Sequence, residues 1–473
     1  MTTRAPRTLS PTDPDDAALA PTTGGAASRR PSPEGVALGL AALLLSAAFA
    51  AEPLGWWGGN VHQWLPPLSA RFDPALGPGL PLAMGVAAAV VRWGPRVACT
   101  VRWRTLLTAT WASGLLWGFG LALLRGWSGG IVAPLAHEDE SLVDVPRVDD
   151  VGEMLRVYTD RILLTSPDHW TTYESGHPPL PLMLYVGLDR IGLGGPGAGG
   201  VVATLLGSTG VVAVLVALRA LGDERRARAA APFLALTPLV IWSVVSTDAI
   251  LMAEVAWGIA LLAVAATTAA PRRRLALSLA AGVVLGLGLF LSYGLVLMAP
   301  VALAVLVAAR TWRPLAPAVV GALLVVAAFA VAGFWWVEGE QTLVVRYYQG
   351  KGGIRPYSYW TWGNLAVAAL AVGPAVVAGL GAAAARTRRG TQRWTRGWAG
   401  ASPTALLALG ALVAILTATL TGLSKSEVER IWLPFMLWLV PLTAALAPVR
   451  ARRWLAASAV WALLVGVVFR TTW

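Results

Sequence analysis

Residues 201–218 read VVATLLGSTGVVAVLVAL, a run of 18 positions without a charged side chain. An α-helix of this length crosses the hydrocarbon core of a bilayer, which is about 30 Å thick. Residues 36–51 and 316–337 form similar runs, in which apolar residues follow one another rather than alternate with polar ones. Because backbone groups in hydrocarbon must satisfy their own hydrogen bonds, these runs predict an all-α integral membrane protein.

The composition of the whole chain agrees with a membrane protein. Of 473 residues, 56% are hydrophobic and 13% are charged, whereas about a quarter of the residues in a soluble protein are charged. The net charge of +12 comes from arginine, since lysine occurs only at Lys351 and Lys425. In a membrane protein such cations mark cytoplasmic loops, so no nucleic-acid partner is expected. The single cysteine, Cys99, excludes an internal disulfide and a multi-cysteine metal site.

Clusters of arginine alternate along the chain with loops that are rich in acidic and aromatic residues. The clusters lie at residues 29–30, 92–104, 219–228, 272–274, 310–313, 386–396 and 450–453. The positive-inside rule then predicts about 13 crossings, with the N-terminus in the cytoplasm and the C-terminus outside. The expected spans are 35–52, 79–93, 104–124, 199–218, 229–247, 249–268, 275–292, 295–309, 316–337, 363–385, 402–422, 431–447 and 454–470.

The domain organisation follows from these spans. Residues 1–34 are rich in Pro, Thr, Ser, Gly and charge, which predicts a disordered cytoplasmic tail. Residues 35–103 are expected to form an additional N-terminal transmembrane hairpin. Residues 104–473 are expected to form the main transmembrane domain, with a large extracytoplasmic loop over residues 125–177.

Residues 178–218 are too long for one helix and contain the sequence GGPG at 194–197. We interpret residues 178–192 as an interfacial or re-entrant helix, followed by one crossing. Two crossings are the alternative, and they would invert every later loop.

The polar residues of chemical interest lie in the loops expected outside. All four histidines, His62, His137, His169 and His177, fall in these loops.

The large loop opens with AHEDE at residues 136–140. Three adjacent acids repel one another, which raises the pKa of at least one of them and suits a general base. We therefore consider Asp139, Glu140 and Glu138 as candidate catalytic residues. A solvated acidic loop is the simpler alternative, and a metal site is less favoured because one loop supplies few ligands.

Two further strings place polar groups at the ends of apolar runs. His177 precedes Pro178, Pro179 and Leu180, and prolines at a helix start hold the residue before them extended. His177 either lies over a pocket or only marks a helix boundary. Residues 238–249 read PLVIWSVVSTDA and place Asp248 where one crossing ends and the next begins, where it serves a site or caps the following helix.

Cations occur in two outside loops, where the positive-inside rule predicts few. Residues 345–362 read VRYYQGKGGIRPYSYWTW and contain Arg346 and Arg355. Residues 424–432 read SKSEVERIW. Arginine binds phosphate in a fork, so both loops suit an anionic lipid phosphate. The second loop could instead be a local ion-pair network. The candidate substrate-binding residues are His177, Asp248, Arg346, Arg355, Lys425, Glu427 and Arg430.

Taken in order, residues 139–140, 177–180 and 238–248 resemble motifs of the GT-C superfamily of membrane glycosyltransferases, which use polyprenyl-phosphate sugars. The types most similar are protein O-mannosyltransferases, aminoarabinose transferases and the arabinosyl- and mannosyltransferases of bacterial cell envelopes. The resemblance covers roughly residues 104–435. The chain departs from it in its additional hairpin, in the histidine before the prolines, and in lacking a large C-terminal soluble domain.

The resemblance implies an inverting transfer at the outer face of a bacterial plasma membrane. Asp139, or Glu138 or Glu140 in its place, would take the proton of the acceptor hydroxyl. Arg346, Arg355, Arg430 or Lys425 would neutralise the departing phosphate, while His177 and Asp248 shape the pocket. The implied partners are a polyprenyl-phosphate-linked sugar donor, a glycan, lipid or protein acceptor, and membrane lipids. No cofactor is predicted, although some relatives bind a metal ion.

Two other functions fit parts of the sequence. A polytopic transporter or lipid-linked-glycan flippase would show inverted repeats and a charged site at mid-membrane, neither of which is evident. A non-catalytic assembly subunit would retain the fold with a degenerate site.

Overall fold

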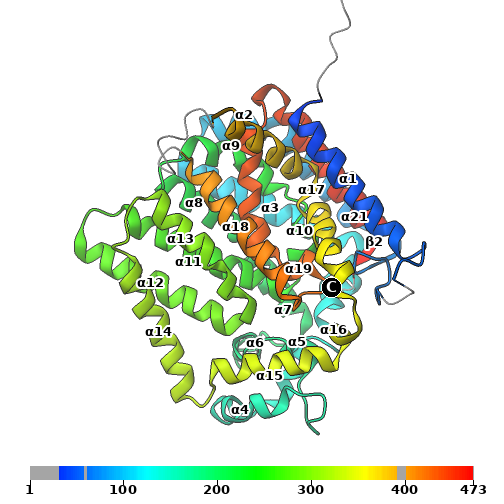
Figure 1. The fold of residues 1–473 in the computed structure, drawn as a ribbon, viewed down its shortest axis with the longest axis vertical. Coiled ribbons are helices and arrows are strands. Elements are labelled where there is room, and N and C mark those ends of the chain that lie inside the picture. Colours follow the sequence, from blue (N-terminus) through cyan, green and yellow to red (C-terminus); the bar gives the residue numbers. More distant parts are fainter. Residues whose placement is uncertain (1–30, 58–60, 391–400, 472–473) are drawn as a thin grey trace, which may run out of the picture. The chain divides into compact units, whose positions relative to one another are not determined.

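The computed structural model of the chain describes residues 31–57, 61–390 and 401–471 and is almost entirely helical (Figure 1). In this part of the chain nine helices are long and apolar enough to cross a membrane, which confirms the prediction of an all-α membrane protein. They are α1 (Pro33–Ala51), α2 (Gly79–Thr100), α3 (Trp103–Ala122), the continuous pair α7 (Pro196–Gly207) and α8 (Gly210–Ala220), α11 (Thr247–Thr267), α12 (Pro271–Leu291), α17 (Tyr357–Gly390), α18 (Pro403–Thr421) and α21 (Ala451–Val468). The predicted cytoplasmic tail lies mostly outside the described residues.

The predicted number of 13 crossings is not confirmed. Four of the predicted spans, at residues 229–247, 295–309, 316–337 and 431–447, are shorter or broken helices. The corresponding elements are α9 (Glu224–Ala235) and α10 (Val240–Ser243), then η8 (Tyr293–Met298) and α13 (Ala299–Ala308), then α14 (Leu315–Val331) and α15 (Trp336–Gln349), and finally α20 (Leu433–Met436) and η10 (Leu437–Ala445).

Proline and glycine account for three of these four breaks. Pro232 lies inside α9 and Pro441 inside η10, and a proline in a helix interior removes a backbone hydrogen bond and clashes with the preceding turn. Gly333, with φ of 105°, lies where the chain turns from α14 into α15. The two helices are bent by 75° relative to each other, and counting them as one span gives ten. Hydropathy alone does not detect such breaks, because the side chains on either side remain apolar.

Short helices connect α3 to α7. They are η2 (Leu123–Arg125), η3 (Ser128–Val132), η4 (Pro134–Ala136), η5 (Ser141–Val143), η6 (Val145–Arg147), α4 (Val151–Val157), η7 (Thr159–Arg161), α5 (Thr172–Ser175) and α6 (Leu180–Arg190). The interpretation of residues 178–218 as one short helix and one long one matches α6 followed by the α7–α8 pair. The remaining short helices are α16 (Lys351–Ile354), α19 (Val428–Ile431) and η11 (Pro448–Arg450).

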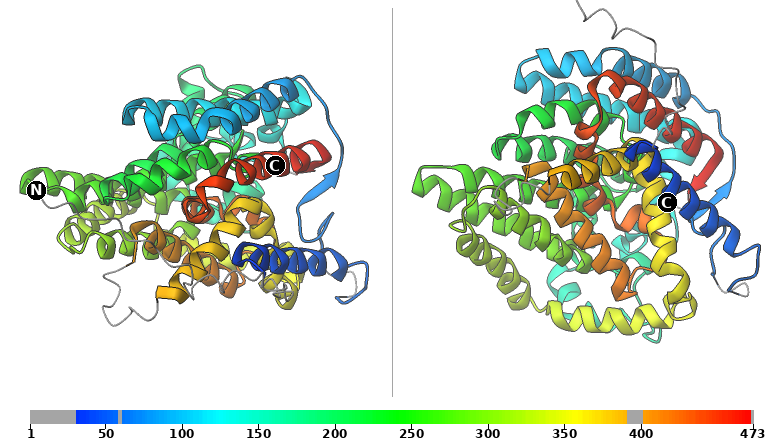
Figure 2. Two further views of the ribbon diagram at one scale, coloured as in Figure 1. Left: turned by 90° about the horizontal axis from the view of Figure 1, so that it is seen from above. Right: turned by 45° about the horizontal axis from the view of Figure 1, so that its top comes forward.

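Residues 33–473 form one unit, in which α1 and α2 pack mainly against different helices. Helix α1 lies along α17, as both views in Figure 2 show, and Tyr359 donates a hydrogen bond to the Ala48 carbonyl at 3.0 Å. Helix α2 packs against α3, α9 and α21. The chain after α1 returns through the strand β1 (Ala70–Phe72), which pairs antiparallel with β2 (Phe469–Thr471). Both termini of the described unit are therefore held by the bundle.

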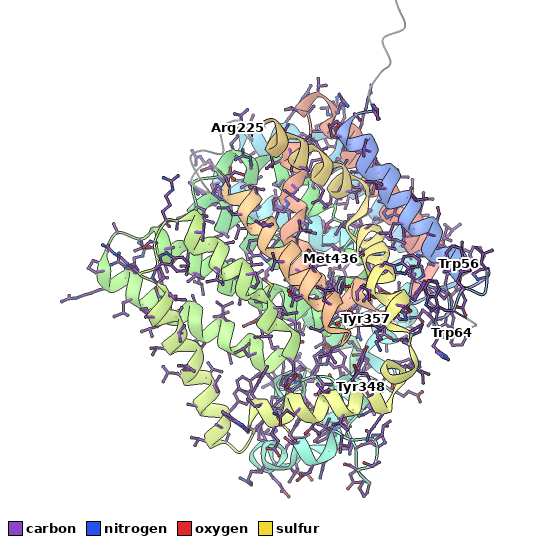
Figure 3. The ribbon with its side chains drawn as sticks, in the orientation of Figure 1. Trp56, Trp64, Arg225, Tyr348, Tyr357 and Met436 are labelled. Atoms are coloured by element: carbon purple, nitrogen blue, oxygen red, sulfur yellow. The ribbon has the colours of Figure 1, made fainter. Side chains whose placement is uncertain are left out.

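Three of the arginine-rich segments, at residues 92–104, 219–228 and 450–453, lie together at one end of the bundle. Arg228 of α9 donates to a carbonyl near the end of α2 at 2.9 Å, and Arg452 of α21 donates to another α2 carbonyl at 2.9 Å. Figure 3 shows Arg225 at this end and Tyr348 of α15 toward the opposite end. The loops that carry the candidate site residues are thus separated from the basic turns by the length of the helices.

Candidate functional site

Four of the predicted site residues meet around one guanidinium. Arg430, whose side chain is only 9% exposed, places Nη1 3.3 Å from Glu140 Oε1, Nε 3.3 Å from Asp248 Oδ2 and Nη2 3.9 Å from Glu427 Oε2. We call Arg430, Glu140, Asp248 and Glu427 the Arg430 cluster. Its members come from the loop before η5, from α11, and from α19 with the loop before it. A buried arginine of this kind needs such partners, because an uncompensated charge is costly away from water.

Asp248 reaches the Arg430 cluster because another residue caps its helix. The Ser246 hydroxyl accepts a hydrogen bond from the Asp248 N–H at 3.2 Å and forms the N-cap of α11. The next residue, Thr247, exchanges a hydrogen bond with the Tyr185 hydroxyl at 2.7 Å. The Asp248 carboxylate is left for Arg430, and its position in the first turn of a helix also favours a negative charge.

The loop that carries Glu427 has an unusual backbone. Ser426 and Glu427 have φ angles of 79° and 63°, a region that residues other than glycine rarely adopt. Asn364 of α17 holds the loop, since its Oδ1 accepts from the Ser426 N–H at 3.2 Å and its Nδ2 donates to the Ser424 carbonyl. Such strain persists only where surrounding contacts enforce it, and it is typical of functional sites.

The three adjacent acids lie in different environments. Glu140 is 4% exposed, and its burial raises its pKa to about 7 although Arg430 opposes the shift. Asp139 is 43% exposed, accepts a hydrogen bond from the Thr172 hydroxyl at 2.6 Å, and has Oδ2 3.6 Å from Nδ1 of His137. Glu138 is exposed. Of the three, Asp139 is both accessible and fixed in position, as a base that meets a substrate must be.

His177 is linked to the Arg430 cluster through Tyr173. Its ring stacks on Tyr173 with 4.0 Å between centroids, and its Nδ1 lies 2.7 Å from the Tyr173 carbonyl. The Tyr173 ring in turn lies 5.4 Å from the guanidinium carbon of Arg430, a cation–π distance. Burial lowers the pKa of His177, because removal from water disfavours the charged imidazolium.

The other predicted cations differ in what they already bind. Arg355 places Nη2 3.5 Å from Glu427 Oε1 and donates from Nη1 to the Lys425 carbonyl at 2.8 Å. Lys425 donates from Nζ to the Gly352 carbonyl at 2.8 Å. Arg346 of α15 is buried, its Nε has no hydrogen-bond partner among the described residues, and Asp139 is near enough to act on it electrostatically. Arg346 therefore has the most capacity left for an anion.

Several contributors were not assigned a role from the sequence. Tyr173 and Thr172 lie shortly before His177 in the sequence. Because they place an aromatic ring and a hydroxyl beside a candidate site residue, their position could have indicated a role in the site. Glu174 is fully buried, and the Tyr158 hydroxyl donates to its Oε2 at 2.9 Å. Burial raises the pKa of Glu174 to about 8. Asn364 is a single amide in an apolar run, and the sequence offered no signal for it.

The carboxylates of the Arg430 cluster do not fit a divalent metal ion. No group of three or more His, Cys, Asp or Glu side chains in the described part of the chain is arranged to hold one. Glu140, Asp248 and Glu427 instead face three different nitrogens of a guanidinium, which already supplies the positive charge between them. Ca²⁺ or Mg²⁺ would need these oxygens around a shared centre at about 2.0–2.6 Å.

Comparison with known proteins gives a likeness in structure but not in sequence. No family model matches the sequence, and no curated protein matches it. Among solved structures, the chain is similar to the oligosaccharyltransferase of Archaeoglobus fulgidus, determined as a complex with Zn and sulfate. The TM-score is 0.47 and the sequence identity 14%, over 76% of this chain and 51% of that one. The chain thus spans about half the length of that enzyme.

Proposed function

We propose that the chain is a membrane glycosyltransferase that moves a sugar from a polyprenyl-phosphate donor to a cell-envelope acceptor. The observation that carries the proposal is an accessible carboxylate, Asp139, next in sequence to Glu140 of the Arg430 cluster and near enough to the buried Arg346 to act on it electrostatically. Glycosyl transfer from a phosphate requires a base and an anion-binding group in one site.

The reaction follows from these groups. Asp139 takes the proton of an acceptor hydroxyl while that oxygen forms a bond to the anomeric carbon of the sugar. The bond between this carbon and the phosphate oxygen breaks, and the polyprenyl phosphate leaves with the electron pair. Arg346 neutralises the negative charge that develops on the leaving oxygen, and it does so strongly because it is shielded from water.

The Arg430 cluster has a positioning role in this mechanism. Glu140 and Asp248 hold Arg430, and Arg430 lies against Tyr173, whose N–H donates to the Asp139 carbonyl at 2.9 Å. The backbone carbonyl of the base and the residue after it are therefore both linked to the buried ion pair. Such support keeps a catalytic group within the narrow range of geometry that catalysis requires.

We place the reaction at the extracytoplasmic face of a bacterial plasma membrane, with the N-terminus in the cytoplasm. The arginine-rich segments at residues 92–104, 219–228 and 450–453 lie at the end of the bundle away from α15, and cytoplasmic loops are the ones that collect arginine. A lipid donor fits this position, since its tail can remain among the helices while its phosphate reaches the site.

The proposal is tested by a transfer assay with the full chain in nanodiscs and a radiolabelled polyprenyl-phosphate sugar. We expect Asp139→Asn to lower the transfer rate by about 10² to 10⁴-fold, the usual contribution of a general base. Glu138→Gln, at an exposed neighbouring position, should retain the wild-type rate. Full transfer by Asp139→Asn would remove Asp139 as the base. A wild-type protein that translocates the donor without forming a glycosidic bond would instead be a flippase.

A further inference from the structure

A polar cavity of 540 Å³ lies beside the β1–β2 ladder. Its walls come from both strands, from the end of α3 and the segment after it, and from α10. This volume is within the range of about 300–1,000 Å³ that small-molecule sites occupy. None of the residues that line it belongs to the Arg430 cluster.

The cavity is strongly basic. Arg71, Arg125 and Arg470 line it, and Asp73 is the one carboxylate among its lining residues. With His137 neutral, the lining carries a formal charge of +2. Such a charge on a concave surface attracts an anion.

The strand register sets two of these arginines against each other. Arg71 pairs directly with Arg470 across the ladder, so both side chains leave the same face. Like charges at directly opposed positions destabilise a strand pair. An anion bound between the two guanidiniums would attract both of them and so offset the repulsion between them.

Asp73 only partly compensates the arginines. Its Oδ2 lies 3.1 Å from Arg125 Nη1 and 3.9 Å from Arg470 Nη1. Arg71 lies over the ring of Trp64, with 3.8 Å to the centroid, and this aromatic face orients the guanidinium without neutralising it. One carboxylate shared by Arg125 and Arg470 therefore leaves the lining with two positive charges in excess, which a bound anion would balance.

The cavity also reaches the proposed base. His137 lines it, and the Nδ1 of the same imidazole is 3.6 Å from Asp139 Oδ2. On the other side, the Ser69 N–H, next to β1, donates to Glu429 Oε1 at 3.2 Å, and Glu429 adjoins Arg430 in α19. The imidazole of His137 thus lies between the cavity and the carboxylate that is proposed to activate the acceptor.

We infer that this cavity binds the acceptor through a phosphate group held by Arg71 and Arg470, with the acceptor hydroxyl directed toward Asp139. The identification of the ligand as the acceptor rests on the proposed function. The phosphate site itself does not depend on that function. Phosphate fits better than carboxylate, since it offers three or more acceptor oxygens to several guanidinium forks. The phosphate could belong to a lipid headgroup or to a water-soluble molecule.

Binding is measured on the full chain in phosphatidylcholine nanodiscs, as the shift in thermal midpoint caused by inorganic phosphate against chloride at equal ionic strength. A second arm uses nanodiscs that contain phosphatidylglycerol, in chloride. We expect stabilisation in at least one arm, and the arm that shows it identifies a soluble phosphate or a lipid headgroup as the source. The Arg71→Gln/Arg470→Gln double variant should lose that stabilisation.

A control makes the result specific. Arg313→Gln removes an exposed arginine in a predicted cytoplasmic turn, outside both proposed phosphate sites, so it should keep the stabilisation. Losing one charge-assisted contact should weaken binding about 10- to 100-fold. Stabilisation that is absent from wild type in both arms, or that survives fully in the double variant, would overturn the inference.

Kinetics separate this inference from the proposed function. If the chain transfers sugar, Arg470→Gln should raise KM for the acceptor and leave KM for the donor unchanged, whereas Arg346→Gln should do the reverse. An Arg470→Gln variant with an unchanged acceptor KM would refute the acceptor assignment. Phosphate binding without any sugar transfer would refute the proposed function and leave the anion site standing.

Discussion

Two adjacent carboxylates, Asp139 and Glu140, show how environment separates residues that look alike in the sequence. Asp139 is held by a threonine hydroxyl and remains accessible, whereas Glu140 is buried against Arg430. The sequence could indicate that one of the acids 138–140 was special, but not which one. Their burial depends on Tyr173 and Arg430, which come from distant parts of the chain.

The pH dependence of the rate distinguishes these two acids. Burial raises the pKa of Glu140 from 4.5 to about 7, so the folded protein binds this proton more tightly than the unfolded chain. Stability from this group therefore falls as pH rises from about 4.5 to about 7. If Asp139 is the base and Glu140 only holds Arg430, Glu140→Gln should lower kcat less than Asp139→Asn does. A rise of kcat/KM with a midpoint near pH 7 that disappears in Glu140→Gln would assign the base to Glu140.

At the scale of elements, the long helix α17 supports the loop that carries Glu427 and precedes α19. Its Asn364 is 1% exposed and pairs with the backbone of both Ser424 and Ser426. The strained backbone at Ser426 and Glu427 is then fixed from the bundle and not by the loop itself. An amide inside a transmembrane helix is in this case a positioning residue.

Asn364→Leu should disturb the site without disrupting insertion. The change leaves two buried backbone groups without partners, a loss of about 1–3 kcal/mol each. We expect kcat to fall about tenfold or more, with donor KM changed less. Thr417→Val is a matched control, because Thr417 lies on α18 and bonds only within its own helix. Unchanged kcat in Asn364→Leu would show that the loop does not need this support.

The sequence predicted membrane-spanning helices better where hydrophobicity alone determines their extent. The run at residues 201–218 lies within one helical span, Pro196–Ala220, that is long enough to cross a membrane, as expected. The run at 316–337 looked equally suitable, yet the chain bends after α14. Gly333 and the tryptophans after it allow α15 to run across the end of the bundle, and this turn is what brings Arg346 to the site. Hydropathy could not predict that turn.

For the molecule as a whole, the proposed location of the reaction depends on which end of the bundle faces the cytoplasm. Cys99 is exposed and lies near the end of α2, among the basic turns. Glu138 is exposed in the loop that carries the proposed base. These two positions lie at opposite ends of the bundle, and thiol labelling can test on which side of the membrane each one lies.

A membrane-impermeant maleimide applied to intact spheroplasts should leave the native Cys99 unlabelled. In a Cys99→Ser background, Glu138→Cys should be labelled from outside. Permeabilised cells provide the control, where both should react. Labelling of Cys99 alone in intact spheroplasts would reverse the topology and place the site in the cytoplasm.

The convergence of distant residues was only partly predictable. The sequence grouped Glu140, Asp248, Glu427 and Arg430 by their shared position in outside loops, and the structure brings these four together. It did not indicate that Arg430 would lie at the centre of three carboxylates. Nor did it indicate the basic cavity at β1–β2, because Arg71 and Arg470 are almost 400 positions apart and meet only through a three-residue ladder.

The most direct measurement is a structure of the chain in nanodiscs with a non-transferable polyprenyl-phosphonate sugar. We predict that the phosphonate lies within hydrogen-bond distance of the Arg346 guanidinium, about 3 Å, with the anomeric carbon of the sugar facing Asp139. A phosphonate bound at the arginine-rich end, or one that touches neither Arg346 nor the Arg430 cluster, would contradict the account.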